Sequence, residues 1–98
     1  MEIKKILNEG VLSIALKGRL DTTTAPNLEA ELNESMAGVG VLVLDCSELE
    51  YVSSAGLRVI LATQKVMNKQ GKMVIKNVNE TIMEVFEITG FVDILTIE

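Results

Sequence analysis

Histidine is absent from the 98 residues of this chain. Without an imidazole, the sequence contains neither a Ser-His-Asp nor a Cys-His catalytic arrangement, and no histidine-ligated metal site. Most routes by which a domain of this size becomes an enzyme are therefore closed. We expect a protein that is not an enzyme and that holds no metal ion and no cofactor of its own.

Cysteine and long hydrophobic runs are also scarce. Cys46 is the single cysteine, so no internal disulfide can form and nothing indicates an oxidising compartment. A core or strand-end position is the expected place for this thiol. The opening "MEIKKILNEG" has too short an apolar stretch for a signal peptide. No stretch approaches the ~20 apolar residues that cross a bilayer. These absences predict a cytoplasmic protein without membrane contact.

Positive charge is in the minority, with 9 Lys and Arg against 14 Asp and Glu and a net charge of −5. The chain therefore lacks the basic surface of a direct nucleic-acid binder, and contact with an anionic membrane is disfavoured. A protein partner with basic groups suits this charge better. Aromatic residues make up 3% and hydrophobic residues 48%. This composition predicts one domain over residues 1–98 with an aliphatic core.

What is present is an alternation of short apolar runs and helical patterns. Strands are predicted at residues 3–7, 11–17, 39–44, 72–78 and 91–98. Helices are predicted after the threonines at 22–24, from near Ser54 to Gly71, and from Asn79 to Gly90. Because the run at 39–44 is apolar almost throughout, it resembles a central parallel strand that is buried on both faces. The order β-β-α-β-α-β-α-β predicts an α/β domain with a mixed, mostly parallel sheet flanked by helices.

Polar residues follow two of these strands. Asp21 comes after the second strand, and Asp45, Ser53 and Ser54 come after the third. Ligands of open α/β sheets meet the loops beyond the carboxyl ends of parallel strands. A serine hydroxyl at a helix N-terminus either caps the helix or serves as a place where a phosphate is tolerated. Both interpretations of Ser54 remain open on spacing alone.

The neighbouring charges carry similar alternatives. Asp21 and Asp45 are either an acid-base or metal-binding pair or, more commonly, turn formers and surface charge. Arg58 lies four residues after Ser54, on the same helix face, where it contacts a phosphate or is simply solvated.

Three segments resemble the STAS-domain anti-sigma factor antagonists of bacteria. They are "GRLDTTTAPNLEAEL", "VLVLDCSELEYVSSAGLRVIL" and "EVFEITGFVDIL", and the similarity extends, in the same order, over nearly the whole chain. The resemblance implies a STAS-like fold. It also implies a function: the antagonist binds an anti-sigma factor that is a serine kinase and so releases a sigma factor. The kinase uses ATP to phosphorylate one serine of the antagonist, which breaks the complex, and a serine phosphatase restores binding.

Within "SSAGL", the family's phosphorylated serine matches Ser54, followed by Gly56. The resemblance further implies a kinase-facing surface that includes Asp21, Thr22, Ser53 and Arg58, with Gly56 leaving room for close approach of the partner or its nucleotide.

This chain departs from the family pattern in two places. Many members carry Asp immediately before the phosphorylated serine, whereas this chain has Ser53, a second possible acceptor. A terminal helix found in some members is also expected to be absent. STAS modules that are never phosphorylated exist as well. The alternative function is therefore an unphosphorylated scaffold subunit of a transporter or another multiprotein assembly.

Overall fold

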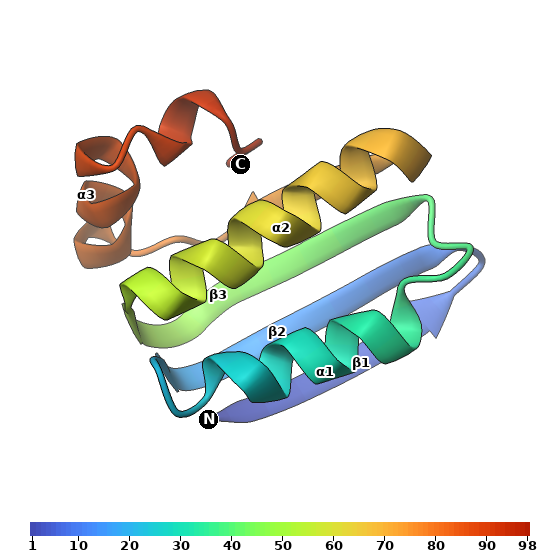
Figure 1. Ribbon diagram of the computed structural model, residues 1–98, viewed down its shortest axis with the longest axis horizontal. Coiled ribbons are helices and arrows are strands. Elements are labelled where there is room, and N and C mark those ends of the chain that lie inside the picture. Colours follow the sequence, from blue (N-terminus) through green and yellow to red (C-terminus); the bar gives the residue numbers. More distant parts are fainter.

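The computed structural model describes all residues from 1 to 98 and contains a four-stranded sheet in the order β1-β2-β3-β4 (Figure 1). The strands are β1 (Glu2–Asn8), β2 (Val11–Leu20), β3 (Val41–Val52) and β4 (Lys72–Lys76). The helices are α1 (Ala25–Ser35), α2 (Ser54–Gln70), α3 (Glu80–Ile88) and the short 3-10 helix η1 (Phe91–Asp93). The predicted α/β fold with a mixed, mostly parallel sheet is confirmed.

The sheet begins with a hairpin. β1 pairs antiparallel with β2, while β2–β3 and β3–β4 are parallel pairs. Glu9 and Gly10 join β1 to β2, and both have positive φ, 50° and 79°. A two-residue hairpin turn requires positive φ at both of its central residues when the twist of the turn is to match the right-handed twist of the strands.

Helices α1 and α2 lie side by side over one face of the sheet (Figure 1). Alternate residues of the two central strands point into this layer and are buried, among them Leu12, Ile14 and Leu16 of β2 and Leu42, Leu44 and Cys46 of β3. The aliphatic core predicted from the composition is therefore present. Phe86 of α3 adds the one fully buried aromatic ring, stacked at 6.5 Å on Phe91.

The third helix is held against the second half of β3. Asn79 caps α3 as predicted, since its Oδ1 accepts a hydrogen bond from the N–H of Ile82 at 2.9 Å. Its Nδ2 donates to the carbonyl oxygen of Leu49 at 2.9 Å. One side chain therefore begins the helix and attaches it to the sheet.

Several strand boundaries differ from the prediction, among them the end of β2, at Leu20 instead of residue 17, and two larger differences. β3 continues to Val52 instead of ending at residue 44, so Asp45 lies within the strand and not in a loop after it. Two bulges relative to β2 accommodate the polar residues of this longer strand. The last predicted strand, 91–98, begins as the 3-10 helix η1 and pairs with β4 only through a parallel bridge between Ile75 and Ile97.

Candidate functional site

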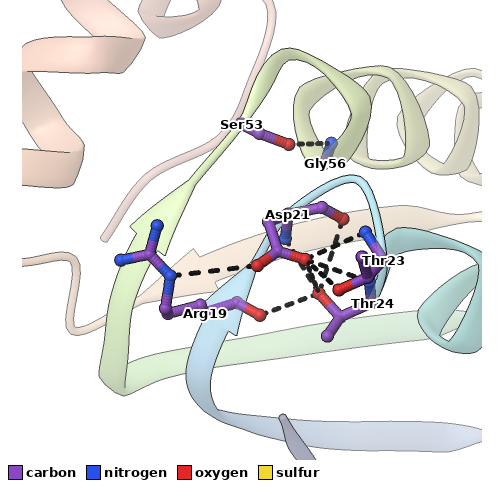
Figure 2. A network of polar contacts seen from close by, with 6 residues as sticks. All are labelled: Arg19, Asp21, Thr23, Thr24, Ser53 and Gly56. Atoms are coloured by element: carbon purple, nitrogen blue, oxygen red, sulfur yellow. Dashed lines mark hydrogen bonds and ion pairs between the residues drawn. The ribbon is translucent and has the colours of Figure 1, made fainter.

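The carboxyl ends of β2 and β3 meet at one edge of the molecule. The N–H of Ser53 donates to the carbonyl oxygen of Leu20 at 2.8 Å, which joins the residue before α2 to the last residue of β2. Asp21 follows Leu20 directly, and Ser54 follows Ser53. Asp21, Ser53 and Ser54 therefore lie at the same end of the sheet, where Figure 2 shows Asp21 and Ser53. Asp45, which the sequence grouped with them, does not lie there.

The two adjacent serines have different environments. Ser53 is the N-cap of α2: it is half-buried, and its Oγ accepts a hydrogen bond from the N–H of Gly56 at 3.3 Å (Figure 2). Ser54 is the first residue of the helix and is exposed, and its hydroxyl makes no hydrogen bond within the protein. The capping alternative therefore applies to Ser53, and the hydroxyl of Ser54 is left available to another molecule.

Asp21 organises the turn that leads into α1. Its Oδ1 accepts hydrogen bonds from the Thr23 hydroxyl at 2.7 Å, the Thr23 N–H at 3.0 Å and the Thr24 N–H at 3.1 Å (Figure 2). The Thr23 hydroxyl, together with these backbone donors, holds the pKa of Asp21 below its usual value because all of them favour the carboxylate. Asp21 is thus a turn former, and its charge is kept at the same edge as Ser54. Thr22 is exposed on this turn.

A cation next to Asp21 was not predicted. Arg19 lies over the ring of Tyr51, 4.1 Å from its centroid, and its Nε is 3.8 Å from Oδ2 of Asp21. Arg19 and Tyr51 are register partners on β2 and β3. Their adjacency depends on the two bulges of β3, which shift the pairing by amounts that the hydrophobic pattern does not reveal.

Gly56 has a packing role that was not predicted. It is buried, and a Cβ at this position would lie 2.6 Å from Cγ of Leu20. The missing side chain therefore makes room for β2 inside the protein. Close approach of a partner or its nucleotide at Gly56 stays a prediction.

Asp45 and Cys46 lie away from this edge. Asp45 Oδ1 accepts hydrogen bonds from Nδ2 of Asn77 and from the N–H of Ser47, both at 3.0 Å. The Asn77 amide, helped by that N–H, lowers the pKa of Asp45. Val52 lies seven positions after Asp45 on β3, roughly 20 Å away, so Asp21 and Asp45 do not form an acid-base or metal-binding pair. Cys46 lies in the core, as expected, and its burial raises the pKa of the thiol to about 12.

Arg58 is exposed one turn beyond Ser54 and lines a groove between α1 and α2, together with Thr22 and Ala55. The exposed site residues Thr22, Ser54 and Arg58 thus surround the start of α2. No group of three or more His, Cys, Asp and Glu side chains is placed to hold a metal ion. None of the helices combines the length and the apolar composition that a bilayer span requires.

Residues 2–98 match the family model described as the STAS domain. Among curated proteins, BtrV of Bordetella bronchiseptica, whose name places it with the anti-sigma factor antagonists, is 40% identical over 91 residues, covering 91% of this chain and 78% of BtrV. The anti-sigma-B factor antagonist of Bacillus subtilis is 31% identical, covering 92% of this chain and 84% of that protein.

Solved structures agree on the fold. The crystal structure of an anti-sigma factor antagonist from Mycobacterium paratuberculosis has a TM-score of 0.88 at 24% identity, covering 98% of this chain and 83% of that one. The Bacillus cell fate determinant SpoIIAA in its phosphorylated form has a TM-score of 0.77 at 17% identity, covering 99% of this chain and 91% of that one. The STAS-like architecture expected from the sequence is confirmed.

Proposed function

This chain belongs to the STAS domain family, and we propose that it acts as an anti-sigma factor antagonist that phosphorylation of Ser54 switches off. In this proposal it binds an anti-sigma factor that is also a serine kinase, and binding releases a sigma factor. Transfer of the γ-phosphoryl group of ATP to Ser54 ends the complex, and a serine phosphatase restores the binding form. The names of its relatives support the antagonist role, and the geometry around Ser54 supports the switch.

The observation that carries the proposal is the free hydroxyl of Ser54. Ser54 is exposed and lies in the first turn of α2, while Ser53 uses its oxygen to cap the same helix. A kinase can reach the hydroxyl of Ser54 without breaking any contact, whereas it must break the helix cap to reach the hydroxyl of Ser53. Ser54 is therefore the acceptor, even though a serine replaces the acidic residue that precedes it in many family members.

The start of α2 also suits an anion. The first N–H groups of a helix have no partner within the helix, and the helix dipole favours negative charge there. A phosphate on Ser54 is thus compatible with the folded protein. The proposed partner-facing surface is made of the exposed or half-buried residues around it, namely Asp21, Thr22, Ser53 and Arg58. Gly56 lies beneath this surface and contributes to its shape.

Electrostatics gives the switch a plausible magnitude. A phosphoserine carries about −1.5 to −2 charges at neutral pH. A partner covers an exposed hydroxyl at little cost, but a covered dianion loses its water. A penalty of ~3 kcal/mol weakens binding roughly a hundredfold. The carboxylate of Asp21, kept ionised by its turn, adds repulsion at the same edge of the molecule.

Phosphorylation by the cognate anti-sigma kinase tests the acceptor. Incubation with that kinase and ATP, followed by mass spectrometry of the peptides, should place one phosphate on Ser54. Ser54→Ala should remain unmodified and should bind the kinase as tightly as the parent protein. Ser53→Ala is the matched control and should still be phosphorylated on Ser54. Label on Ser53 alone, or none, contradicts the assignment.

Binding measurements separate the switch from the alternative scaffold role. Titration calorimetry with the anti-sigma factor kinase should show tight binding of the unmodified protein and binding weakened about a hundredfold for the phosphorylated protein. Treatment with a serine phosphatase should restore tight binding. Ser54→Asp should bind weakly for the same electrostatic reason. A scaffold subunit that is never phosphorylated predicts equal affinities for the parent, Ser54→Ala and Ser54→Asp.

A further inference from the structure

A groove runs along the outer surface between α1 and α2, the two helices that lie side by side in Figure 1. Its two parts hold about 480 and 270 Å³ and share three lining residues, Glu29, Val59 and Ala62. On α2 the lining extends from Ala55 to Gln70. At 1.5 Å per residue this is about 22 Å, the length of a helix of about four turns.

The groove stays open because small side chains line part of it and because hydrogen bonds fix both ends of α2. Ala55, at one end, and Ala62, near the middle, do not fill the space that faces α1. At one end the N–H of Ser53 donates to the carbonyl of Leu20 at the end of β2. At the other end Nε2 of Gln70 donates to the carbonyl oxygens at positions 36 and 39, at 2.7 and 2.8 Å. The shape is therefore formed before any partner arrives, which lowers the entropic cost of binding.

The floor of the groove is apolar and part of its wall is exposed. Leu32 and Val59 lie at the floor and are 2% and 7% exposed. Val66 is 45% exposed, and Ala62 is exposed beside it. Water therefore covers an apolar strip between two helices, and an apolar stripe of another helix would displace it.

The charges on the groove indicate what else the partner carries. Arg58 and Lys65 stand on the α2 wall, and neither takes part in an ion pair. They are seven residues apart, so two helical turns, about 10.5 Å, separate them on one flank. Glu29 stands on the opposite, α1 side of the groove. Two cations on one wall of a chain with a net charge of −5 favour a ligand with carboxylates on that flank.

We propose that this groove is a docking site for an amphipathic helix of a partner protein. The helix lays an apolar stripe on Val59, Ala62 and Val66 and places two carboxylates seven residues apart against Arg58 and Lys65. This inference goes beyond the proposed switch, because it assigns a surface that extends about four turns away from Ser54 and needs no phosphoryl transfer.

Two helical peptides of about 15 residues, stapled and labelled with fluorescein, test the proposal. Both carry an apolar stripe of leucine and alanine; one has glutamates seven residues apart on one flank, and its twin has lysines there. Fluorescence anisotropy with the full chain should show the glutamate peptide binding about tenfold tighter than the lysine peptide. The double variant Arg58→Glu with Lys65→Glu should reverse this preference. Lys69→Glu, an exposed charge outside the groove, is the matched control and should leave it unchanged.

A steric variant checks the location. Ala62→Arg fills the middle of the groove and should abolish binding, while Ala30→Arg, on an exposed position of α1 outside the groove, should have no effect. Circular dichroism spectra that match the parent show that both variants fold. The proposal is overturned by equal affinities for the two peptides, by no saturable binding up to about 1 mM, or by full binding to Ala62→Arg. Neither assay uses a kinase or ATP, so its outcome is separate from that of the Ser54 experiments.

Discussion

Replacing Gly56 with alanine introduces a methyl group at the contact between α2 and β2. The added Cβ would lie 2.6 Å from Cγ of Leu20, and 3.0 Å from both its Cδ2 and its carbonyl oxygen. Carbon atoms in favourable contact are about 3.5–4.0 Å apart, so the two elements must separate by roughly 1 Å. Leu20 is fully buried.

Two effects of opposite sign determine the result. Alanine is favoured over glycine within a helix by about 1 kcal/mol. Overpacking a filled core costs about 1–3 kcal/mol, and here backbone atoms at the Leu20–Ser53 junction are displaced as well as a side chain. The steric cost prevails, and we expect Gly56→Ala to lower the free energy of unfolding by about 1–2 kcal/mol.

Urea denaturation followed by circular dichroism measures this difference, and a double-mutant cycle assigns its cause. Leu20→Ala alone should cost about 2–5 kcal/mol because it leaves a cavity. In the double variant the methyl group added at position 56 occupies part of that cavity, so the two changes should cost at least about 1 kcal/mol less than their sum. Gly40→Ala is the control: the nearest atom to a Cβ there is 3.9 Å away, and the effect should stay within about 0.5 kcal/mol.

An increase in the stability of Gly56→Ala would refute the reasoning, because helix propensity would then outweigh the contact with β2. An additive cycle would place the strain elsewhere than at Leu20.

Three further predictions concern the same edge and the core. Ser53→Ala removes the cap on the N–H of Gly56 and should lower the unfolding free energy by about 1 kcal/mol, while Ser53→Asp should retain most of it in urea titrations. The pKa values of Asp21 and Asp45 are lowered in the folded protein, so both carboxylates stabilise the fold above the unfolded pKa of about 3.9. This contribution disappears as the pH falls through the folded pKa values. Urea denaturation between about pH 6 and 2 should therefore show a smaller decrease in the free energy of unfolding for Asp21→Asn and Asp45→Asn than for the parent protein. The Cys46 thiol, buried and with a pKa of about 12, should react with a thiol reagent at neutral pH only as fast as the protein opens, and a rapid reaction in the native state would contradict this.

Most of the secondary structure was readable from local signals. Asn79 marked the start of α3 and Gly71 the end of α2, because caps and helix ends depend on residues close in sequence. The last strand was predicted wrongly for the opposite reason. The run at 91–98 is apolar enough for a strand, but its first residues form a 3-10 helix whose Phe91 stacks on Phe86, a residue of α3.

The length of β3 was also beyond local signals. Its second half mixes polar residues with single apolar ones, and only pairing with β2 through two bulges keeps it extended to Val52. This pairing moved Asp45 away from the site, and it brought Arg19 over Tyr51.

The sequence by itself determined the alternation of strands and helices, the aliphatic core and the presence of two hydroxyls at the start of α2, since all of these follow from residue type and spacing. Only the tertiary structure decided that Ser53 caps the helix and Ser54 remains free, that Gly56 serves the contact with β2, and that α1 and α2 leave a groove between them. These outcomes depend on distances between segments far apart in the chain, and neither periodicity nor propensity carries that information.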